Sequence, residues 1–315
     1  MKNDSLVSIL IPVYNREKYI EQCVRSAMSQ TYENIEIVIV DNCSLDKTVE
    51  IIQGLQEEDR RIKLFQNSQN IGPVKNWEKC IREASGEYGK ILWSDDYIAD
   101  TFLDKTVPYF SDNHVGFVYT RVEVFGEEFK TVELYNIGET KTCLTKEYIE
   151  QMIAGNSNYP VSPGCALFRM QDLRNNLMID IPNKVNADLS QLAIGNDLLL
   201  FLLTANKYNK YEYINETLSY FRVHEESITI SSKDGKIPIF YALAKAFFVE
   251  RYQKNLVKKF NIQLRALLRA EHVETEKYGF IQIEDFYMKN QSSSLPITFY
   301  VKAAILKLKR MMGFK

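Results

Sequence analysis

The sequence lacks a long hydrophobic run, because no apolar stretch in its 315 residues approaches the roughly 18 residues that a membrane-spanning helix needs. The opening residues, Met1 to Ser5, carry no apolar segment of the signal-peptide type. Hydrophobic residues make up 45% of the chain and charged residues 25%, which is typical of a soluble globular protein with a core of its own. We therefore expect a cytoplasmic protein.

Cysteine and histidine are scarce. The five cysteines are an odd number and include no CxxC pair, which argues against a disulfide framework and against a zinc site. Cys23 and Cys80 fall on the apolar faces of expected helices, so we place both in the core as reduced thiols. Of the three histidines, His114 and His272 have no setting that suggests a role.

A glycine-rich phosphate loop is also missing. The first apolar run, residues 6–12, is followed by Val13, Tyr14 and Asn15 without a glycine cluster. The dinucleotide-binding fingerprint and the P-loop both need glycines, which allow the backbone to approach phosphate groups. Hydride transfer and P-loop chemistry therefore lose their sequence signature, and a bound diphosphate would have to be neutralised in another way.

The sequence does contain a regular alternation of strand-length apolar runs and segments with helical periodicity. This alternation predicts an α/β fold with a mainly parallel sheet flanked by helices. Ligands bind such sheets beyond the carboxyl ends of the strands, so the site is expected in the loops that follow them. The expected strands are 6–12, 35–40, 62–65 and 88–93, and the expected helices are 20–28, a segment after Asp46, and 77–84.

The pattern changes after about residue 110. Shorter strands are expected at 211–214 and 218–223, with helices near 146–152 and 197–205. From Pro238 onward the chain is predicted to be helical, with segments at 241–260 and 262–273. We therefore predict two parts, residues 1–230 and a helical C-terminal appendage over residues 231–315.

Two adjacent carboxylates follow the fourth expected strand. Asp95 and Asp96 should reach the ligand-binding edge of the sheet beside Asp41, which follows the second strand. An isolated pair of aspartates is more often a solvated loop or a helix cap, but clustered acids at a ligand site cost stability unless a cation is bound. Carboxylate oxygens suit Mn²⁺ and Mg²⁺. We therefore predict a divalent metal site whose ion neutralises a diphosphate.

Four segments carry a resemblance to a known family: residues 7–15 (VSILIPVYN), 30–44 (QTYENIEIVIVDNCS), 70–72 (NIG) and 94–96 (SDD). Together they resemble the inverting family-two glycosyltransferases with the GT-A fold, of the kind that builds bacterial cell-surface glycans, across roughly residues 6–228. The resemblance implies a Rossmann-like catalytic domain over residues 1–230. Residues 1–110 would form its nucleotide-binding half and residues 111–230 its acceptor-side half.

The reaction that the resemblance implies is transfer of a sugar, with inversion, from a nucleotide-sugar donor such as a UDP-sugar to a glycan or lipid-linked saccharide. It places Asp41 at the base, Asp95 at the ribose and Asp96 on the metal, and carboxylates can accept hydrogen bonds from a base N–H and from ribose hydroxyls. Tyr14 could instead pack in the core, and Gly72 could have no role other than to start a helix. The other implied donor-binding residues are Pro12, Val13, Asn15, Asn70 and Ser94.

The resemblance extends to Asn196 and Asp197, where relatives usually carry Glu-Asp. It implies that Asp197 is the catalytic base, and the chemistry requires one because the acceptor hydroxyl must lose its proton as it attacks the sugar. A carboxylate at the start of an expected helix could equally be a helix cap. Asn196 in place of the usual Glu implies a different contact with the acceptor.

Two further segments look like parts of the family's site. Residues 220–224 (YFRVH) resemble a loop that reaches the donor, which implies a metal contact for His224 and a diphosphate contact for Arg222. Arg222 could instead be a structural ion-pair partner. Ser162 and Gly164 lie in a segment that resembles the border of the acceptor site, although an ordinary loop explains it as well.

The last residues combine apolar residues at helical spacing with basic ones. Val301, Ala304, Ile305 and Leu308 keep that spacing, and Lys302, Lys307, Lys309, Arg310 and Lys315 occur without an acid among them in the last fifteen residues. Such a helix can contact an anionic membrane surface or pack on the catalytic domain. The first alternative would place the protein at the inner face of the cell membrane.

Two other functions are compatible with parts of the sequence. One is a non-catalytic module that binds nucleotide sugars or glycans, and the other is a glycoside hydrolase with two carboxylates. Nucleic-acid binding is not expected, because the predicted catalytic part shows no basic stripe.

Overall fold

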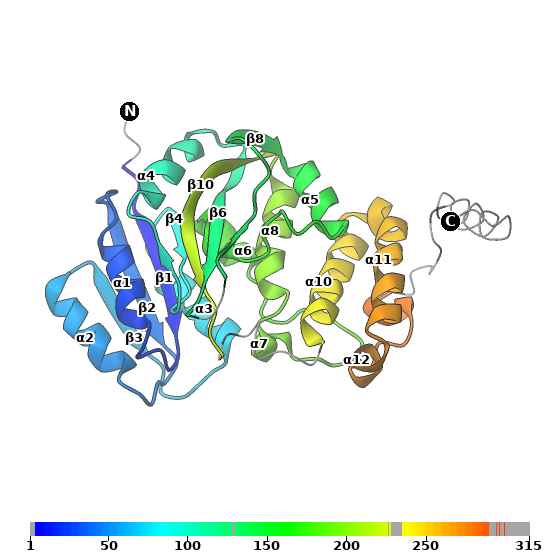
Figure 1. The fold of residues 1–315 in the computed structure, drawn as a ribbon, viewed down its shortest axis with the longest axis horizontal. Helices are drawn as coiled ribbons and strands as arrows, with labels where there is room; N and C mark the ends of the chain where they lie inside the picture. The colour runs from blue at the N-terminus through cyan, green and yellow to red at the C-terminus, as the bar shows by residue number, and fades with distance from the viewer. Residues whose placement is uncertain are drawn as a thin grey trace.

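The computed structural model describes residues 4–127, 130–225, 227, 235–289, 294, 296 and 299. Within this part, the chain forms the predicted α/β fold, with a central sheet between layers of helices (Figure 1). The predicted amphipathic tail from Val301 onward lies outside the described residues.

Over the described residues the central sheet has ten strands, and its main path runs in the order β3-β2-β1-β4-β9-β6-β10-β5. The predicted parallel half is confirmed, because β1 pairs in parallel with β2 and β4, and β2 pairs in parallel with β3. β9 is antiparallel to β4 and β6, which makes the whole sheet mixed. The strands are β1 (Val7–Val13), β2 (Ile35–Asp41), β3 (Ile62–Gln66), β4 (Tyr88–Ile91), β5 (Tyr97–Ile98), β6 (Val115–Phe125), β7 (Val132–Leu134), β8 (Lys141–Leu144), β9 (Ala166–Arg169) and β10 (Lys210–Arg222).

The prediction of two short strands at 211–214 and 218–223 is wrong, because β10 is one continuous strand that runs parallel to β6. Asn215 and Glu216 interrupt the apolar pattern between the two expected strands. They lie at a shift in register against β6, between Ile214 and Thr217. An irregularity of this kind absorbs polar residues without ending the strand, and so the sequence pattern breaks where the backbone does not.

Helices cover both faces of the sheet. Alternate residues of β1 face opposite sides, so Ile9 and Ile11 join the core under one helical layer and Leu10 joins the core under the other. Burial on both faces explains the nearly continuous apolar runs of β1 and β2. One layer contains α1 (Ile20–Met28), α2 (Thr48–Glu58) and α4 (Phe102–Thr106), and the other contains α3 (Pro73–Glu83), α5 (Thr145–Ile153), α6 (Met170–Asn176) and α8 (Asn196–Lys207). Short segments are η1 (Val107–Ser111), η2 (Pro163–Cys165) and α7 (Leu189–Leu192).

The C-terminal region is helical, as predicted, but the predicted single helix over 241–260 is wrong. α10 (Lys236–Tyr252) ends at Gln253, whose φ of −135° and ψ of 56° are not helical. Apolar periodicity continues on both sides of this break, so the sequence gives no sign of it. The helices that follow are η3 (Lys254–Leu256), α11 (Val257–Ala270), α12 (His272–Lys277) and η4 (Ile283–Phe286).

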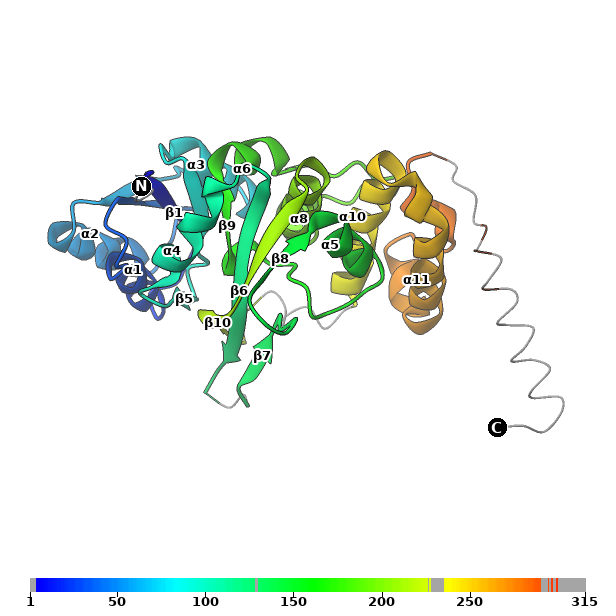
Figure 2. The same ribbon diagram turned by 90° about the horizontal axis from the view of Figure 1, so that it is seen from above.

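α10 lies between α8 and α11 in both views (Figures 1 and 2). Phe240 and Leu243 of α10 are buried in the same hydrophobic cluster as Leu199 of α8 and Phe168 of β9. α10, from the predicted appendage, therefore shares a core with the predicted catalytic part and packs against α8, the helix that carries Asp197.

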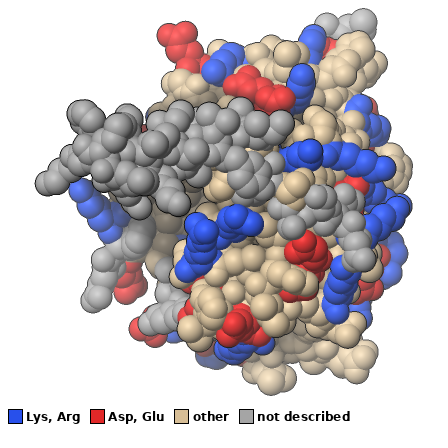
Figure 3. Space-filling model, turned by 90° about the vertical axis from the view of Figure 1, so that its right-hand side faces the viewer, with Lys and Arg blue, Asp and Glu red and all other residues tan. Residues whose placement is uncertain are grey.

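The end of the molecule formed by the C-terminal helices carries both signs of charge. Lys and Arg side chains occur there beside Asp and Glu side chains and larger uncharged areas (Figure 3). Lys258, Lys259 and Arg269 of α11 are exposed. Among the described residues, no helix has the length and the hydrophobicity that crossing a bilayer requires.

Candidate active site

A cavity of about 730 Å³ lies beyond the carboxyl ends of β1 and β4, where the sequence places the site. Its walls come from the loops after these strands, the end of β10, and the first turns of α3, α8 and α10. The predicted site residues that line it are Pro12, Val13, Tyr14, Asn70, Ser94, Asp95, Asp96, Ser162, Asp197 and Arg222. Asn15, Asp41, Gly72, Gly164, Asn196 and His224 are not among its lining residues.

Asp41 and Asn15 connect the loops that follow β1 and β2. The buried carboxylate of Asp41 accepts hydrogen bonds from the backbone N–H groups of Cys43 and Ser44 at 3.1 Å. Ser44 accepts from the backbone N–H of Asn15 at 2.8 Å, and Asn15 accepts from the N–H of Leu45 at 2.8 Å. These bonds fix the loop backbone beside the cavity, and the role of Asp41 at a base stays a prediction.

Asparagine side chains hold the loop that leads into α3. Asn42 donates to Asn70 at 2.9 Å and accepts from the backbone N–H of Ile71 at 3.0 Å. Asn70 also accepts from the backbone N–H of Gly72 at 2.9 Å. Gly72 has a φ of +87° and precedes Pro73 at the first position of α3, so it starts this helix, which was the simpler of its two explanations.

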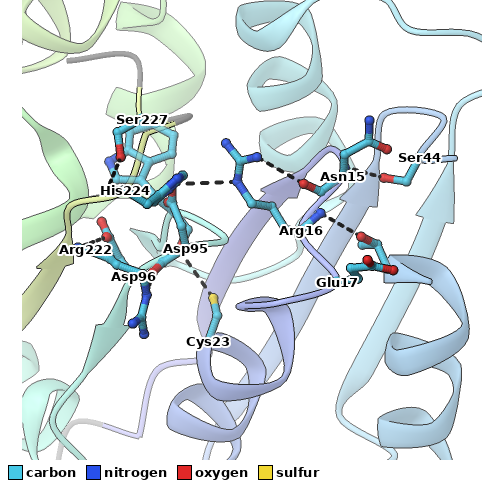
Figure 4. A network of polar contacts seen from close by, with 12 residues as sticks. Asn15, Arg16, Glu17, Cys23, Ser44, Asp95, Asp96, Arg222, His224 and Ser227 are labelled. Carbon is cyan, nitrogen blue, oxygen red and sulfur yellow. Dashed lines mark hydrogen bonds and ion pairs between the residues drawn. The ribbon is translucent and has the colours of Figure 1, made fainter. Parts of the chain in front are cut away.

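Asp95 contacts side chains from two other parts of the site (Figure 4). Its Oδ2 atom lies 2.9 Å from Nε2 of His224 and 3.7 Å from Nε of Arg16. Its backbone carbonyl accepts from Nε of Arg222 at 3.0 Å. The loop after β4 is therefore tied both to the loop after β1 and to the end of β10, although nearly 130 residues separate Asp95 from His224.

Arg222 has mainly structural contacts. Its guanidinium lies 5.0 Å from the ring centre of Tyr19 and 4.6 Å from that of Phe125, and it donates to the side chain of Gln22. Stacking of a guanidinium on aromatic faces stabilises its position. Arg222 also lines the cavity, and its contact with a diphosphate stays a prediction.

Asp96 is buried next to a second acid. Burial raises the pKa of Asp96 well above its ordinary value, and the neighbouring Asp95 carboxylate raises it further. The backbone N–H of Arg222 donates to its Oδ1 atom at 2.8 Å. Within the described chain, Oδ2 of Asp96 accepts no hydrogen bond, and the side chain faces the cavity. A cation would relieve the repulsion between the two carboxylates.

The residues present fit a divalent ion that is shared with a ligand. Among the described residues, no group of three or more His, Cys, Asp and Glu side chains converges as a metal cage would require. Mg²⁺ characteristically binds through one or two carboxylates together with substrate phosphates and water, which needs no such cage. In the described chain, Nδ1 of His224 is buried without a hydrogen-bond partner, which leaves this ring incompletely satisfied. Asp96 would hold the ion, whereas Nε2 of His224 is engaged by Asp95, so a metal contact for His224 stays a prediction.

Asp197 also lines the cavity, from the first turn of α8. Its Oδ1 atom accepts from the backbone N–H groups of Gly195 at 3.0 Å and Leu198 at 2.8 Å, and its Oδ2 atom accepts from the hydroxyl of Tyr241 at 2.6 Å. Burial raises the pKa of Asp197 to about 6, against the lowering effect of these hydrogen bonds. A pKa near the working pH suits a general base. The hydrogen bonds from the backbone at the start of α8 also fix the position of the Asp197 carboxylate.

The predicted acceptor residues have different positions. Ser162 lines the cavity and accepts from Nε1 of Trp93 at 2.9 Å. Gly164 lies behind this wall, where its carbonyl accepts from the buried side chain of Lys90. Asn196 is fully buried, and its amide donates to the carbonyl of Met178 at 2.7 Å. Asn196 thus supports the cavity wall from behind, and the geometry gives no support to direct contact with an acceptor.

The sequence profile of Glycosyl transferase family 2 matches residues 8–177, which is more than half of the chain. The chain belongs to this family. The matched region includes β1, the asparagine-rich loop, the two adjacent aspartates and the Ser162 wall. Asp197 and His224 lie beyond it, so the family match by itself says nothing of these two residues.

Some relatives of this family 2 glycosyltransferase match it over most of the chain, well beyond residues 8–177. An uncharacterized glycosyltransferase of Haemophilus influenzae is 29% identical over 310 residues, 91% of each chain. TuaG of Bacillus subtilis, named for teichuronic acid biosynthesis, is 27% identical over 270 residues, 81% of this chain and 97% of TuaG. Another uncharacterized glycosyltransferase of H. influenzae is 37% identical over 133 residues, so the chain spans about half of that relative's length (53%) and the match covers 41% of this chain.

Solved structures with the same fold include enzymes with bound nucleotide sugars. S. aureus TarS 1–349 in complex with UDP-GlcNAc has a TM-score of 0.64 and 20% identity, covering 89% of this chain and 77% of TarS. The mannosyltransferase PcManGT from Pyrobaculum calidifontis, in complex with GDP-Man and Mn²⁺, has a TM-score of 0.53 and 14% identity over 96% of this chain and 80% of its own. At such identities, these structures show the fold alone.

Several residues of the family 2 site were not predicted from the sequence. Arg16 directly follows the predicted segment 7–15, and Trp93 directly precedes the predicted residue Ser94. Both could have been found from their position in the sequence. Trp93 also packs against Trp77 of α3, with ring centres 4.7 Å apart and the ring planes tilted by 48°. Tyr241 had no such signal, because it lies forty-four residues after Asp197 in a helix that reads as core.

Replacing Gly195 with alanine is expected to lower the free energy of unfolding by roughly 2 kcal/mol or more. Gly195 has a φ of +94°, and an added Cβ atom would lie 2.8 Å from the Cβ of Ala244 in α10. The change should therefore strain the turn before Asp197 and separate α8 from α10. Denaturant unfolding followed by circular dichroism measures this effect.

The matched control is Gly54→Ala in α2. Gly54 lies inside a helix at a position where an added Cβ would meet nothing within 4 Å, so alanine should stabilise the protein by about 0.5–1 kcal/mol. Equal effects of the two substitutions would contradict the close approach of α10 to the turn that precedes Asp197.

Proposed function

We propose that this family 2 glycosyltransferase transfers a sugar, with inversion, from a UDP-sugar to a saccharide acceptor, with a divalent metal at Asp96 and with Asp197 as general base. The observation that carries this proposal is that the residues predicted to bind the donor and the predicted base line the same cavity. Asp95, Asp96, Arg16 and Arg222 all line this cavity, and so does Asp197.

The donor end of the cavity is suited to a nucleoside diphosphate. Arg16, Asp95, Asp96 and Arg222 are all there, joined by the contacts around Asp95. A divalent ion bound at Asp96 would neutralise the diphosphate and stabilise it as a leaving group. Arg16 and Arg222 would add cationic groups beside the same phosphates, and Tyr14 offers an aromatic face to the nucleotide.

Asp197 would take the proton from the acceptor hydroxyl. Its Oδ1 atom is occupied by two backbone N–H groups, whereas its Oδ2 atom accepts only from Tyr241. A carboxylate oxygen has two lone pairs, so Oδ2 can accept one more hydrogen bond from the side of the cavity. Removal of the proton by a base opposite the leaving diphosphate is consistent with a single displacement and inversion at the sugar.

Aromatic side chains also line the cavity: Trp77, Trp93, Tyr135, Phe221 and Tyr241. Aromatic faces suit the apolar faces of sugar rings. We therefore propose a glycan or lipid-linked saccharide as acceptor, in keeping with the relative named for teichuronic acid biosynthesis.

A donor screen tests the proposed function. We expect release of nucleoside diphosphate from one of UDP-glucose, UDP-galactose, UDP-GlcNAc or GDP-mannose in the presence of Mn²⁺, with slow hydrolysis when no acceptor is present. Loss of release on adding a chelator is the expected control result. Tight donor binding without any turnover, with glycan acceptors supplied, would instead support a non-catalytic nucleotide-sugar-binding module.

A further inference from the structure

The C-terminal helix α10 reaches the catalytic turn at several points. Ala244 packs on Gly195, since an added Cβ at Gly195 would lie 2.8 Å from the Ala244 Cβ and 3.2 Å from the carbonyl oxygen of Phe240. Tyr241, between these two residues, points its hydroxyl at Oδ2 of Asp197 at 2.6 Å. Ile237 and Tyr241 also line the cavity. α10 is therefore part of the wall of the active site.

The contacts divide the two oxygens of Asp197 between different elements. The backbone of its own turn holds Oδ1, through Gly195 and Leu198, and α10 holds Oδ2 through Tyr241. The backbone bonds would persist for any carboxylate or amide at this position. The Tyr241 bond is the one that acts on Oδ2 among the described residues, and it fixes which lone pair of this oxygen is left to accept a further proton.

We propose that Tyr241 is a positioning residue for sugar transfer, which orients Asp197 and keeps its carboxylate ionised, so that the C-terminal helices complete the active site. This inference rests on the proposed role of Asp197 as general base. A hydrogen bond to the ionised form of a carboxylate favours that form. Tyr241 thereby offsets part of the cost of burying a charge among aromatic side chains.

Among the described residues, the other groups whose pKa is raised by the charge of Asp197 are tyrosines. Tyr135, which follows β7, and Tyr148 of α5 both have pKa values raised by burial and further by Asp197. Neither donates a hydrogen bond to it, since Tyr148 donates to the carbonyl of Pro160 at 2.7 Å. Among the described residues, Tyr241 is thus the one side chain whose removal changes the bonding of this carboxylate.

The test is the pH dependence of donor turnover in Tyr241→Phe, measured on the full chain with Mn²⁺ and the donor of highest turnover from the screen. In the wild type, kcat/KM should rise with pH through about 6, as Asp197 loses its proton. Without the tyrosine hydroxyl the carboxylate is harder to ionise, so the acid limb should move up by about one pH unit, with roughly tenfold lower activity below it. KM for the donor should be unchanged.

Tyr148→Phe is the matched control, because it removes a buried hydroxyl and its hydrogen bond from the same core without touching Asp197. Its acid limb should stay at the wild-type pH. If Tyr241→Phe does not fold, 3-fluorotyrosine introduced at position 241 keeps the shape of the side chain. Its more acidic hydroxyl donates a stronger bond, and the limb should then move to lower pH.

An unshifted acid limb in Tyr241→Phe, or in the fluorotyrosine protein, would overturn the inference. Combination with Asp197→Asn separates this failure from that of the proposed function. If Tyr241 acts through Asp197, the double variant should be no more than about twofold slower than Asp197→Asn alone. Wild-type turnover in Asp197→Asn would instead remove the base, and with it the proposed mechanism.

Discussion

Asp197→Asn is expected to lower turnover by about 10²-fold or more while leaving the affinity for the donor nearly unchanged. Asparagine has the same shape, and its side-chain oxygen can still accept from the backbone N–H groups of Gly195 and Leu198. The hydroxyl of Tyr241 can accept a hydrogen bond from the side-chain NH₂ group of the introduced asparagine. The substitution therefore removes the basic oxygen and little else, and steady-state kinetics with a saturating acceptor measures the loss.

Two controls make the Asp197→Asn result specific. Donor binding measured by calorimetry should match the wild type, because the hydrogen bonds of Asp197 go to Gly195, Leu198 and Tyr241 and not to the predicted donor residues. The thermal midpoint should not fall, because an amide avoids the cost of burying a carboxylate that burial already drives to a pKa of about 6. Turnover within about threefold of the wild type would rule out Asp197 as the base.

Asp96→Asn is expected to lower turnover by about 10²-fold or more and to abolish the dependence of donor binding on Mn²⁺. The asparagine oxygen can still accept from the backbone N–H of Arg222, which keeps the loop in place. Burial and Asp95 both raise the pKa of Asp96, so removal of its charge should not destabilise the fold. Turnover and donor binding across a Mn²⁺ titration give the result.

Asp95→Asn is the natural comparison for Asp96→Asn. Asp95 shares its carboxylate with His224 and Arg16, so this change should weaken nucleotide binding without removing the response to Mn²⁺. An equal loss of metal dependence in both variants would contradict the division of the pair into a ribose contact and a metal contact.

The first half of the fold was predictable from the sequence, because each strand is buried on both faces and each helix has one apolar face. β1, β2 and β3 and the helices between them begin and end within a few residues of the expected positions. Predictions failed where the backbone and the hydrophobic pattern disagree. Asn215 and Glu216 interrupt the pattern inside β10, and Gln253 breaks the helix where the pattern continues.

The site was predictable in its residues more than in its contacts. Loops after parallel strands must meet at one edge, which is why Asp95, Asp96 and the residues after β1 were placed together. Whether a side chain faces the cavity depends on packing, which sequence does not reveal. Asn196 is adjacent to Asp197 yet turns to the carbonyl of Met178, and Tyr241 arrives from a helix whose sequence resembles plain core.

The most direct test of the account is a calorimetric titration of UDP into the wild-type protein, with Mn²⁺ and then with an excess of chelator. The cavity offers two arginines, but it also contains Asp95 and the buried Asp96, whose carboxylates repel a diphosphate unless a cation lies between them. We predict clear binding with Mn²⁺ and at least tenfold weaker binding with chelator, as the loss of an ion that bridges carboxylate and phosphate requires. Equal affinity under both conditions would contradict a metal-bound diphosphate at Asp96.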